Sequence, residues 1–128
     1  MHKKRVHNKT ADNLANQCLD EGMDHSTWLP NGLLALMQAL ALGKRIFLVG
    51  WFDGALRDGK NAAIGLHLQA AWRNGDLNDG PIVRCNLYSA GEKCSATSAY
   101  NTEFYAANRL INAISSLVGK LGAGHGSA

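Results

Sequence analysis

Residues 62–73 read Ala62-Ala-Ile-Gly-Leu-His-Leu-Gln-Ala-Ala-Trp-Arg73, and the architecture of the chain depends on how this segment folds. With a period of two, one face carries the apolar side chains of Ile64, Leu66, Leu68, Ala70 and Trp72. The other face carries Gly65, His67, Gln69 and Arg73. This alternation is typical of a strand that is buried on one side. Alanine, leucine and glutamine also favour helices, so a helix over 62–73 is the alternative to the strand that we predict.

The segments on either side of residues 62–73 also show strand patterns. Residues 44–52 (Lys44-Arg-Ile-Phe-Leu-Val-Gly-Trp-Phe52) are apolar, β-branched and aromatic, which predicts a buried strand. Residues 82–89 alternate apolar and polar side chains after a loop rich in Gly, Asn and Asp at 74–81, which predicts a third strand. Turn residues at 53–61 connect the strands predicted at 44–52 and 62–73. Such a short connection favours antiparallel pairing of the two strands.

Helical spacing of apolar residues marks three further segments. Residues 98–121 have the strongest period, with Phe104, Ala107, Ile111, Ile114 and Val118 at helical intervals. Residues 10–23 follow one helix face, with Thr10 as the N-cap. Residues 30–42 begin with a proline, end before Gly43 and contain no charge, with apolar side chains around nearly the whole circumference. Because one small domain has little material to cover such a helix, we predict a homo-oligomer that forms through residues 31–42.

These elements predict an α+β fold with two N-terminal helices, a three-stranded antiparallel meander and a long C-terminal helix packed on one face of the sheet. We expect a basic flexible arm at 1–9, a single domain at 10–121 and a flexible tail at 122–128. In this arrangement the helices all pack on one side of the meander. The other side of the sheet is then the surface on which to look for a binding site.

That open face predicts a ligand site made from alternating positions of the strands. Its polar and aromatic candidates are Trp51, His67, Gln69, Arg84, Asn86 and Tyr88. His67 is also the candidate general base, because an imidazole titrates near neutral pH. A solvated sheet face without a ligand is the alternative, since antiparallel sheets commonly expose one face to water.

Residues 54–61 (Gly54-Ala-Leu-Arg-Asp-Gly59-Lys60-Asn61) contain the Gly-x4-Gly-Lys spacing after an apolar strand. This stretch resembles the phosphate-binding loop of P-loop nucleotidases, which implies a phosphate cradle formed at Gly54, Gly59 and Lys60. Asn61 stands where that motif has the Ser or Thr that holds magnesium, and Asp58 places a negative charge inside the cradle. A glycine-rich hairpin turn is the alternative that we favour.

The charge distribution and the lack of long apolar segments exclude several classes of function. The net charge is +3, and Lys3, Lys4, Arg5 and Lys9 give the arm +4, which leaves nine basic against ten acidic residues elsewhere. We therefore expect no nucleic-acid partner, because phosphate binding requires a basic face. This holds although the element order from 30–42 onward resembles that of double-stranded-RNA-binding domains. With no apolar run of about 20 residues and no export signal, we expect a cytoplasmic protein without membrane contact.

Metal and redox sites also lack support in the sequence. Cys18, Cys85 and Cys94 have no metal or redox spacing, and a bridge between Cys85 and Cys94 across a turn is the alternative to free thiols. We expect no metal and no cofactor. The sequence thus predicts a non-catalytic small-ligand or protein-binding module that acts as a homo-oligomer. The alternatives are a small-molecule enzyme using the open sheet face, and a nucleotide or nucleic-acid binder using the Gly54–Lys60 loop and the arm.

Overall fold

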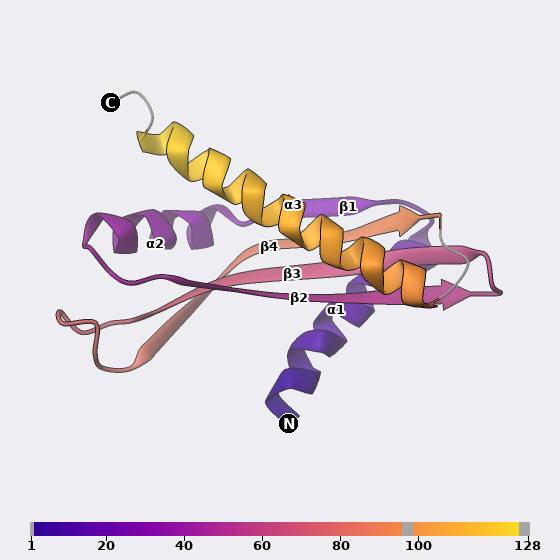
Figure 1. Ribbon diagram of the computed structural model, residues 1–128, viewed down its shortest axis with the longest axis horizontal. Coiled ribbons are helices and arrows are strands. Elements are labelled where there is room, and N and C mark those ends of the chain that lie inside the picture. Colours follow the sequence, from indigo (N-terminus) through magenta and orange to yellow (C-terminus); the bar gives the residue numbers. More distant parts are fainter. Residues whose placement is uncertain (1, 96–98, 126–128) are drawn as a thin grey trace.

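The computed structural model describes residues 2–95 and 99–125, with side chains described at 8–95 and 101–122. Three helices and four strands follow one another in an α-β-α-β-β-β-α order (Figure 1). Their bounds are α1 His2–Glu21, β1 His25–Trp28, α2 Pro30–Ala41, β2 Phe47–Arg57, β3 Asn61–Arg73, β4 Ile82–Cys94 and α3 Ala99–His125. The predicted α+β class is confirmed.

The four strands form one antiparallel sheet in the order β1-β4-β3-β2. β2 pairs with β3 along the whole of β2, from Phe47 opposite Ala71 to Arg57 opposite Asn61, and β4 pairs with the other side of β3. Residues 62–73 are therefore a strand, as predicted, and not a helix. The tight turn between β2 and β3 supports this register, because Lys60 N–H donates to the Arg57 carbonyl at 3.2 Å. Asp58 and Gly59, the two central residues of this β-turn, both have positive φ, as in the turns that hairpins favour.

Our prediction of three strands was wrong by one, because β1 is an additional short strand. β1 pairs antiparallel with the end of β4, with His25 opposite Gly91 and Trp28 opposite Tyr88. Its four residues (His-Ser-Thr-Trp) are too few to show an alternating pattern, so the sequence alone indicated only a break between two helices.

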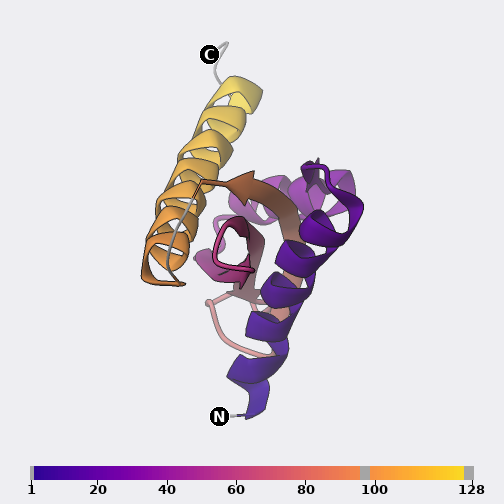
Figure 2. The same ribbon diagram turned by 90° about the vertical axis from the view of Figure 1, so that its right-hand side faces the viewer.

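Helices cover both faces of the sheet, which corrects our expectation that they pack on one side. α2 and α3 lie on one face, where Gly50 of β2 faces Leu110 of α3 and Gly32 of α2 meets the backbone of Asn86. α1 crosses the opposite face (Figure 2). There a Cβ at Gly65 would overlap the carbonyl of Ala11, so α1 rests directly on the backbone of β3. We call the two sides the α3 face and the α1 face.

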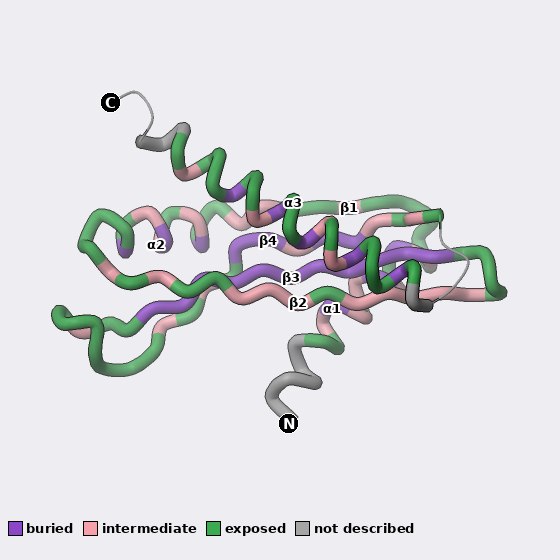
Figure 3. Tube along the Cα trace, viewed as in Figure 1, coloured by how far each residue is buried: buried purple, intermediate pink, exposed green. Residues whose placement is uncertain are grey.

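The main core lies between the sheet and the helices of the α3 face. The alternating residues Ile64, Leu66 and Leu68 of β3 are fully buried there, beneath Leu36 of α2 and Leu117 of α3. A smaller cluster under α1 contains Ala15, Cys18 and Ala63. β3 is the central buried strand in Figure 3, whereas β2 is half-buried or exposed along its length. The predicted division of β3 into two faces is confirmed, but the expectation that its second face is open is wrong, because Gly65, His67 and Gln69 are buried as well.

The outer helices extend further than their apolar patterns indicated. α1 begins at His2, so Thr10 lies inside the helix and residues 2–9, where we expected an arm, are helical. α3 continues to His125, beyond the predicted boundary at 121, and the predicted first residue Ser98 lies outside the described residues. Apolar periodicity marks only the turns that touch the core, which explains why both helices were predicted too short. None of the described helices is long and apolar enough to cross a membrane.

Candidate functional site

α1 covers only one half of its face of the sheet. Ala63 lies under Ala15 and Cys18, and the next residues of β3 on this face, Gly65 and His67, are also buried. Beyond His67 the same face continues to the opposite end of the sheet, where Val49 and Phe47 of β2 pair with Gln69 and Ala71. This uncovered half carries the open face that we predicted from the sequence.

A pocket of about 340 Å³ lies on this uncovered half, at the end where β3 leaves and β4 enters the sheet. It is lined by Phe47, Val49, Ala71, Trp72, Arg73, Ile82 and Arg84, and we call it the sheet-end pocket. Its volume lies at the lower end of the range of small-molecule sites. Apolar side chains form most of the lining, and Phe47 and Ile82 are 56% and 52% exposed. On soluble proteins, a contiguous exposed apolar surface often marks a binding site.

Two arginines give the sheet-end pocket its positive charge. Arg73 donates from Nη1 to the Gly80 carbonyl at 2.8 Å, which fixes its side chain beside the loop after β3. The Arg84 side chain is exposed and makes no hydrogen bond or ion pair with any of the described residues. A guanidinium beside an apolar surface is suited to a carboxylate, sulfonate or phosphate on a molecule with an apolar body.

Gln69 and Asn86 lie one residue pair further along the same face, between the pocket and α1. Gln69 Nε2 donates to Asn86 Oδ1 at 2.7 Å, while Gln69 Oε1 is buried and accepts no hydrogen bond from the described residues. A buried amide oxygen without a donor is costly, and ligands or ordered water often satisfy such groups at functional sites. The structure therefore brings three predicted residues, Gln69, Arg84 and Asn86, to one surface.

Tyr88 does not share this surface, although we grouped it with Arg84 and Asn86. The register of β3 and β4 shifts between Leu68 and Gln69, so that Leu68 faces Tyr88 and Gln69 faces Asn86, with Leu87 as the extra residue. This β-bulge turns Tyr88 to the α3 face, where its ring lies 4.4 Å from that of Trp28. Strict alternation cannot reveal a bulge, which is why the sequence placed Tyr88 on the wrong side.

Trp51 and His67 lie opposite each other on the α1 face, next to the helix. Their rings stack with centroids 5.4 Å apart, and His67 is only 8% exposed. Both residues belong to the predicted set, but they form the boundary between the covered and uncovered halves of the face. Neither residue lines the sheet-end pocket.

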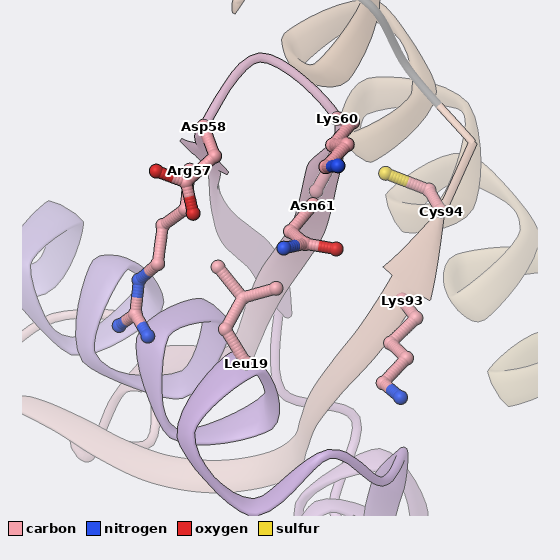
Figure 4. A pocket seen from close by; sticks show the side chains of 8 residues that line it. Leu19, Arg57, Asp58, Lys60, Asn61, Lys93 and Cys94 are labelled. Carbon is pink, nitrogen blue, oxygen red and sulfur yellow. The ribbon is translucent and has the colours of Figure 1, made fainter.

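A second, more polar pocket of about 390 Å³ lies at the opposite end of the sheet, by the β2–β3 hairpin. We call it the hairpin pocket; its lining includes Arg57, Lys60, Asn61, Lys93 and Cys94 (Figure 4). Arg57 is turned towards α1, where it donates to Asp20 at 2.7 Å and Asn16 at 2.9 Å. Lys60 and Lys93 have no ion-pair partner among the described side chains.

The hairpin pocket differs from the phosphate cradle that the Gly54–Lys60 spacing implies. Gly54 lies within β2 and faces Thr102 of α3, whereas Gly59 and Lys60 occupy the turn. The segment after Lys60 is β3, so the loop does not lead into a helix as the phosphate-binding motif requires. The structure has the hairpin turn that we favoured, and Lys60 remains a candidate for binding anions only through its side chain.

Burial suppresses the reactivity of the cysteines. Desolvation raises the pKa of the Cys18, Cys85 and Cys94 thiols, so each stays protonated near neutral pH. All three are free. Cys85 and Cys94 lie on the same strand, about 30 Å apart at the usual rise per residue, which excludes the disulfide alternative. No group of three or more metal-binding side chains occurs among the described residues.

The chain matches no protein-family model, no curated protein and no solved structure. The site is therefore interpreted from its geometry alone. Sequence reasoning did not select the apolar lining residues Val49, Ala71 and Ile82. Strand alternation would have placed all three beside Arg84, but we chose site residues by polarity and so missed the apolar part of the pocket.

Proposed function

We propose that this protein is a non-catalytic binding module, acting as a homo-oligomer, whose sheet-end pocket takes a small amphipathic anion. The observation that carries the proposal is an apolar pocket with Arg84 at its rim and without an ion partner among the described residues. The apolar side chains would contact the body of the ligand, and the guanidinium would hold its acidic group. The ligand class is thus an aromatic or aliphatic carboxylate or sulfonate.

A fluorescent pair of probes tests this proposal. Anilinonaphthalenesulfonate has an aromatic body and an anionic group, and phenylnaphthylamine has nearly the same body without the charge. We expect both to bind, the sulfonate more tightly. Arg84→Gln should weaken sulfonate binding about tenfold, the value of one charge-assisted contact of roughly 1.4 kcal/mol, and leave the neutral probe unchanged.

Lys60→Gln is the matched control, because it removes the same charge at the far end of the sheet. Sulfonate binding that falls with Lys60→Gln and not with Arg84→Gln would contradict the proposal. Equal loss of both probes in Arg84→Gln would also contradict it, because the guanidinium would then act on the fold and not on the anion.

The hairpin pocket supports a second candidate, the binding of a phosphate-bearing molecule. Lys60 and Lys93 place two ammonium groups on one polar cavity beside the Asn61 side chain. Inorganic phosphate and nucleotides would be the probes, and Lys60→Gln should abolish their effect on thermal stability. Among the basic residues of the predicted arm, only Lys9 has a described side chain, and it is exposed.

For the subunit contact, α2 offers the surface that the sequence predicted. One side of α2 packs on the sheet through Gly32, Leu36 and Ala39. Leu34 on its outer side is 56% exposed and Leu42, just after its end, is 76% exposed. These leucines support a contact through residues 31–42, and Leu34→Glu should weaken self-association if they form it.

A further inference from the structure

The two ends of the sheet differ in charge. The β2–β3 hairpin lies at one end, which we call the hairpin end, and the loop 74–81 lies at the other, the loop end (Figure 1). The hairpin end has five acidic and three basic residues, namely Asp20, Glu21, Asp24, Asp58 and Glu92 against Arg57, Lys60 and Lys93. The loop end has four basic and two acidic residues, namely Lys44, Arg45, Arg73 and Arg84 against Asp76 and Asp79. The loop end is therefore positive and the hairpin end negative.

The loop end also exposes large apolar side chains. Leu77 in the middle of the loop is 86% exposed, the highest value among the large apolar side chains that the structure describes. Phe47 and Ile82, at 56% and 52% exposure, line the sheet-end pocket beside this loop. At the hairpin end, Met23 is the large apolar side chain with comparable exposure among the described residues, at 63%. Exposed apolar groups and positive charge therefore occur together at the loop end.

Hydrogen bonds hold the loop that carries Leu77. Gly75 N–H donates to the Asp79 carbonyl at 2.7 Å. The connection between α2 and β2 supports the loop from outside, because Lys44 Nζ donates to the Gly75 carbonyl at 2.8 Å. The Asp79 carboxylate turns back on the loop, since a Cβ at Gly75 would overlap its Oδ1. Leu77 therefore projects from a loop that is fixed on both sides.

Cationic side chains lie beside these apolar groups. Arg45 and Arg84 are exposed and form no ion pair with the described residues. Arg73 is also exposed, and its hydrogen bond to the Gly80 carbonyl keeps it next to the loop. Asp76 is the acidic side chain that opposes this charge. Apolar groups next to guanidinium groups suit a surface that is apolar inside and anionic outside.

We propose that the loop end docks on the surface of an anionic lipid bilayer, with Leu77, Phe47 and Ile82 against the acyl chains and the arginines on the headgroups. Proteins that bind a membrane surface combine buried apolar side chains with basic side chains at headgroup level in this way. The inference rests on the proposed function, because an acidic lipid is an amphipathic anion and the bilayer is then the source of the ligand. Arg84 holds the acidic group of that lipid at the sheet-end pocket.

The bilayer fits the loop end better than a second copy of the chain does. A second loop end carries the same positive charge, and a hairpin end offers only Met23, among the described side chains, to match three exposed apolar groups. We expected no membrane contact from the sequence, because no apolar run is long enough to span a bilayer. Docking on a bilayer surface needs no such run, since single side chains from separate segments supply the contact.

Co-sedimentation of the full chain with lipid vesicles tests the docking surface. We expect binding to vesicles of phosphatidylcholine mixed with phosphatidylglycerol, much weaker binding to phosphatidylcholine alone, and release by salt. Leu77→Glu should weaken binding by about tenfold or more, because it removes an apolar contact and adds a negative charge. Asp76→Asn should strengthen binding about fivefold, the effect of one charge near an anionic membrane.

Met23→Glu is the matched control, because it makes a similar exchange at an exposed position of the hairpin end. It should bind vesicles as wild type does, and circular dichroism verifies that each variant folds. Equal weakening by Met23→Glu and Leu77→Glu would overturn the docking surface. Equal binding to the two kinds of vesicle would also overturn it, because the arginines would then make no contribution.

Binding of anilinonaphthalenesulfonate without vesicles separates this inference from the proposed function. Leu77→Glu should keep the sulfonate affinity of wild type, because Leu77 does not line the sheet-end pocket. A chain that binds the sulfonate through Arg84 but binds no vesicles would overturn the bilayer and preserve the proposed ligand class. Leu77-dependent vesicle binding in a chain whose sulfonate affinity ignores Arg84→Gln would confirm the docking surface and overturn the ligand proposal.

Discussion

The two faces of the sheet differ in how completely they are covered. On the α3 face, α2 and α3 cover the central strand β3, whose residues Ile64, Leu66 and Leu68 are fully buried there. On the α1 face a single helix covers one half and leaves the sheet-end pocket on the other. One face thus supplies the stability of the fold, and the other keeps surface available for binding. Substitutions on the two faces should therefore affect different properties.

The largest loss of folding stability is expected for a substitution on the α3 face. Leu66→Ala should lower the free energy of unfolding by about 3–4 kcal/mol, because Leu66 is fully buried and its removal leaves a cavity. Val49→Ala, on the uncovered half of the α1 face, should cost less than about 1 kcal/mol. Urea denaturation of both variants measures the difference. Equal losses would show that the two faces are equally packed.

Two alanines of β3 test the covered and uncovered halves of the α1 face against each other. Ala63 lies under α1, so Ala63→Leu should overpack the contact and cost about 1–3 kcal/mol. Ala71 lines the sheet-end pocket, so Ala71→Leu should cost less than about 0.5 kcal/mol. The same Ala71→Leu variant should nevertheless lose most of its binding of both fluorescent probes. An Ala71→Leu variant that binds both probes normally would refute the pocket as their site.

The smallest expected change in folding stability is at Asp53, which lies on the covered half of the α1 face. Burial raises the pKa of Asp53, the carboxylates of Asp12 and Glu103 add to this, and the hydrogen bond from Gly54 N–H acts in the opposite direction. A raised pKa in the folded state gives stability that is present in acid, below the ordinary value of 3.8, and is lost as the pH rises through the folded pKa.

Asp53→Asn removes this titration and keeps the acceptor for Gly54. The variant should be more stable than wild type by up to about 0.5 kcal/mol near neutral pH, with the difference disappearing in acid. Denaturation curves at the two pH values measure it. A variant that is less stable than wild type near neutral pH would show that the Asp53 carboxylate forms a favourable interaction.

The sequence predicted those parts of the molecule in which one period persists over many residues. The alternation from Ile64 to Trp72 identified β3 and its two faces, and the helical row from Phe104 to Val118 identified α3. β1 was missed because four residues cannot establish a period. Tyr88 was misplaced because a bulge reverses the alternation of β4 without a mark in the residue types.

The candidate site was predictable only in its polar half. Gln69, Arg84 and Asn86 were selected as polar residues on an alternating face, and the structure brings them together. The extent of the uncovered face could not be predicted, because it depends on where α1 crosses the sheet. That crossing is set by close packing of Ala11 on Gly65, a tertiary contact between segments far apart in the sequence.

Amide chemical-shift mapping of the wild-type chain with anilinonaphthalenesulfonate tests the binding site most directly. The account predicts that the largest shifts lie at residues 47–49, 69–73 and 82–86, which surround the sheet-end pocket. Shifts concentrated at residues 57–61 and 93–94, around the hairpin pocket, would contradict it and assign anion binding to Lys60 and Lys93.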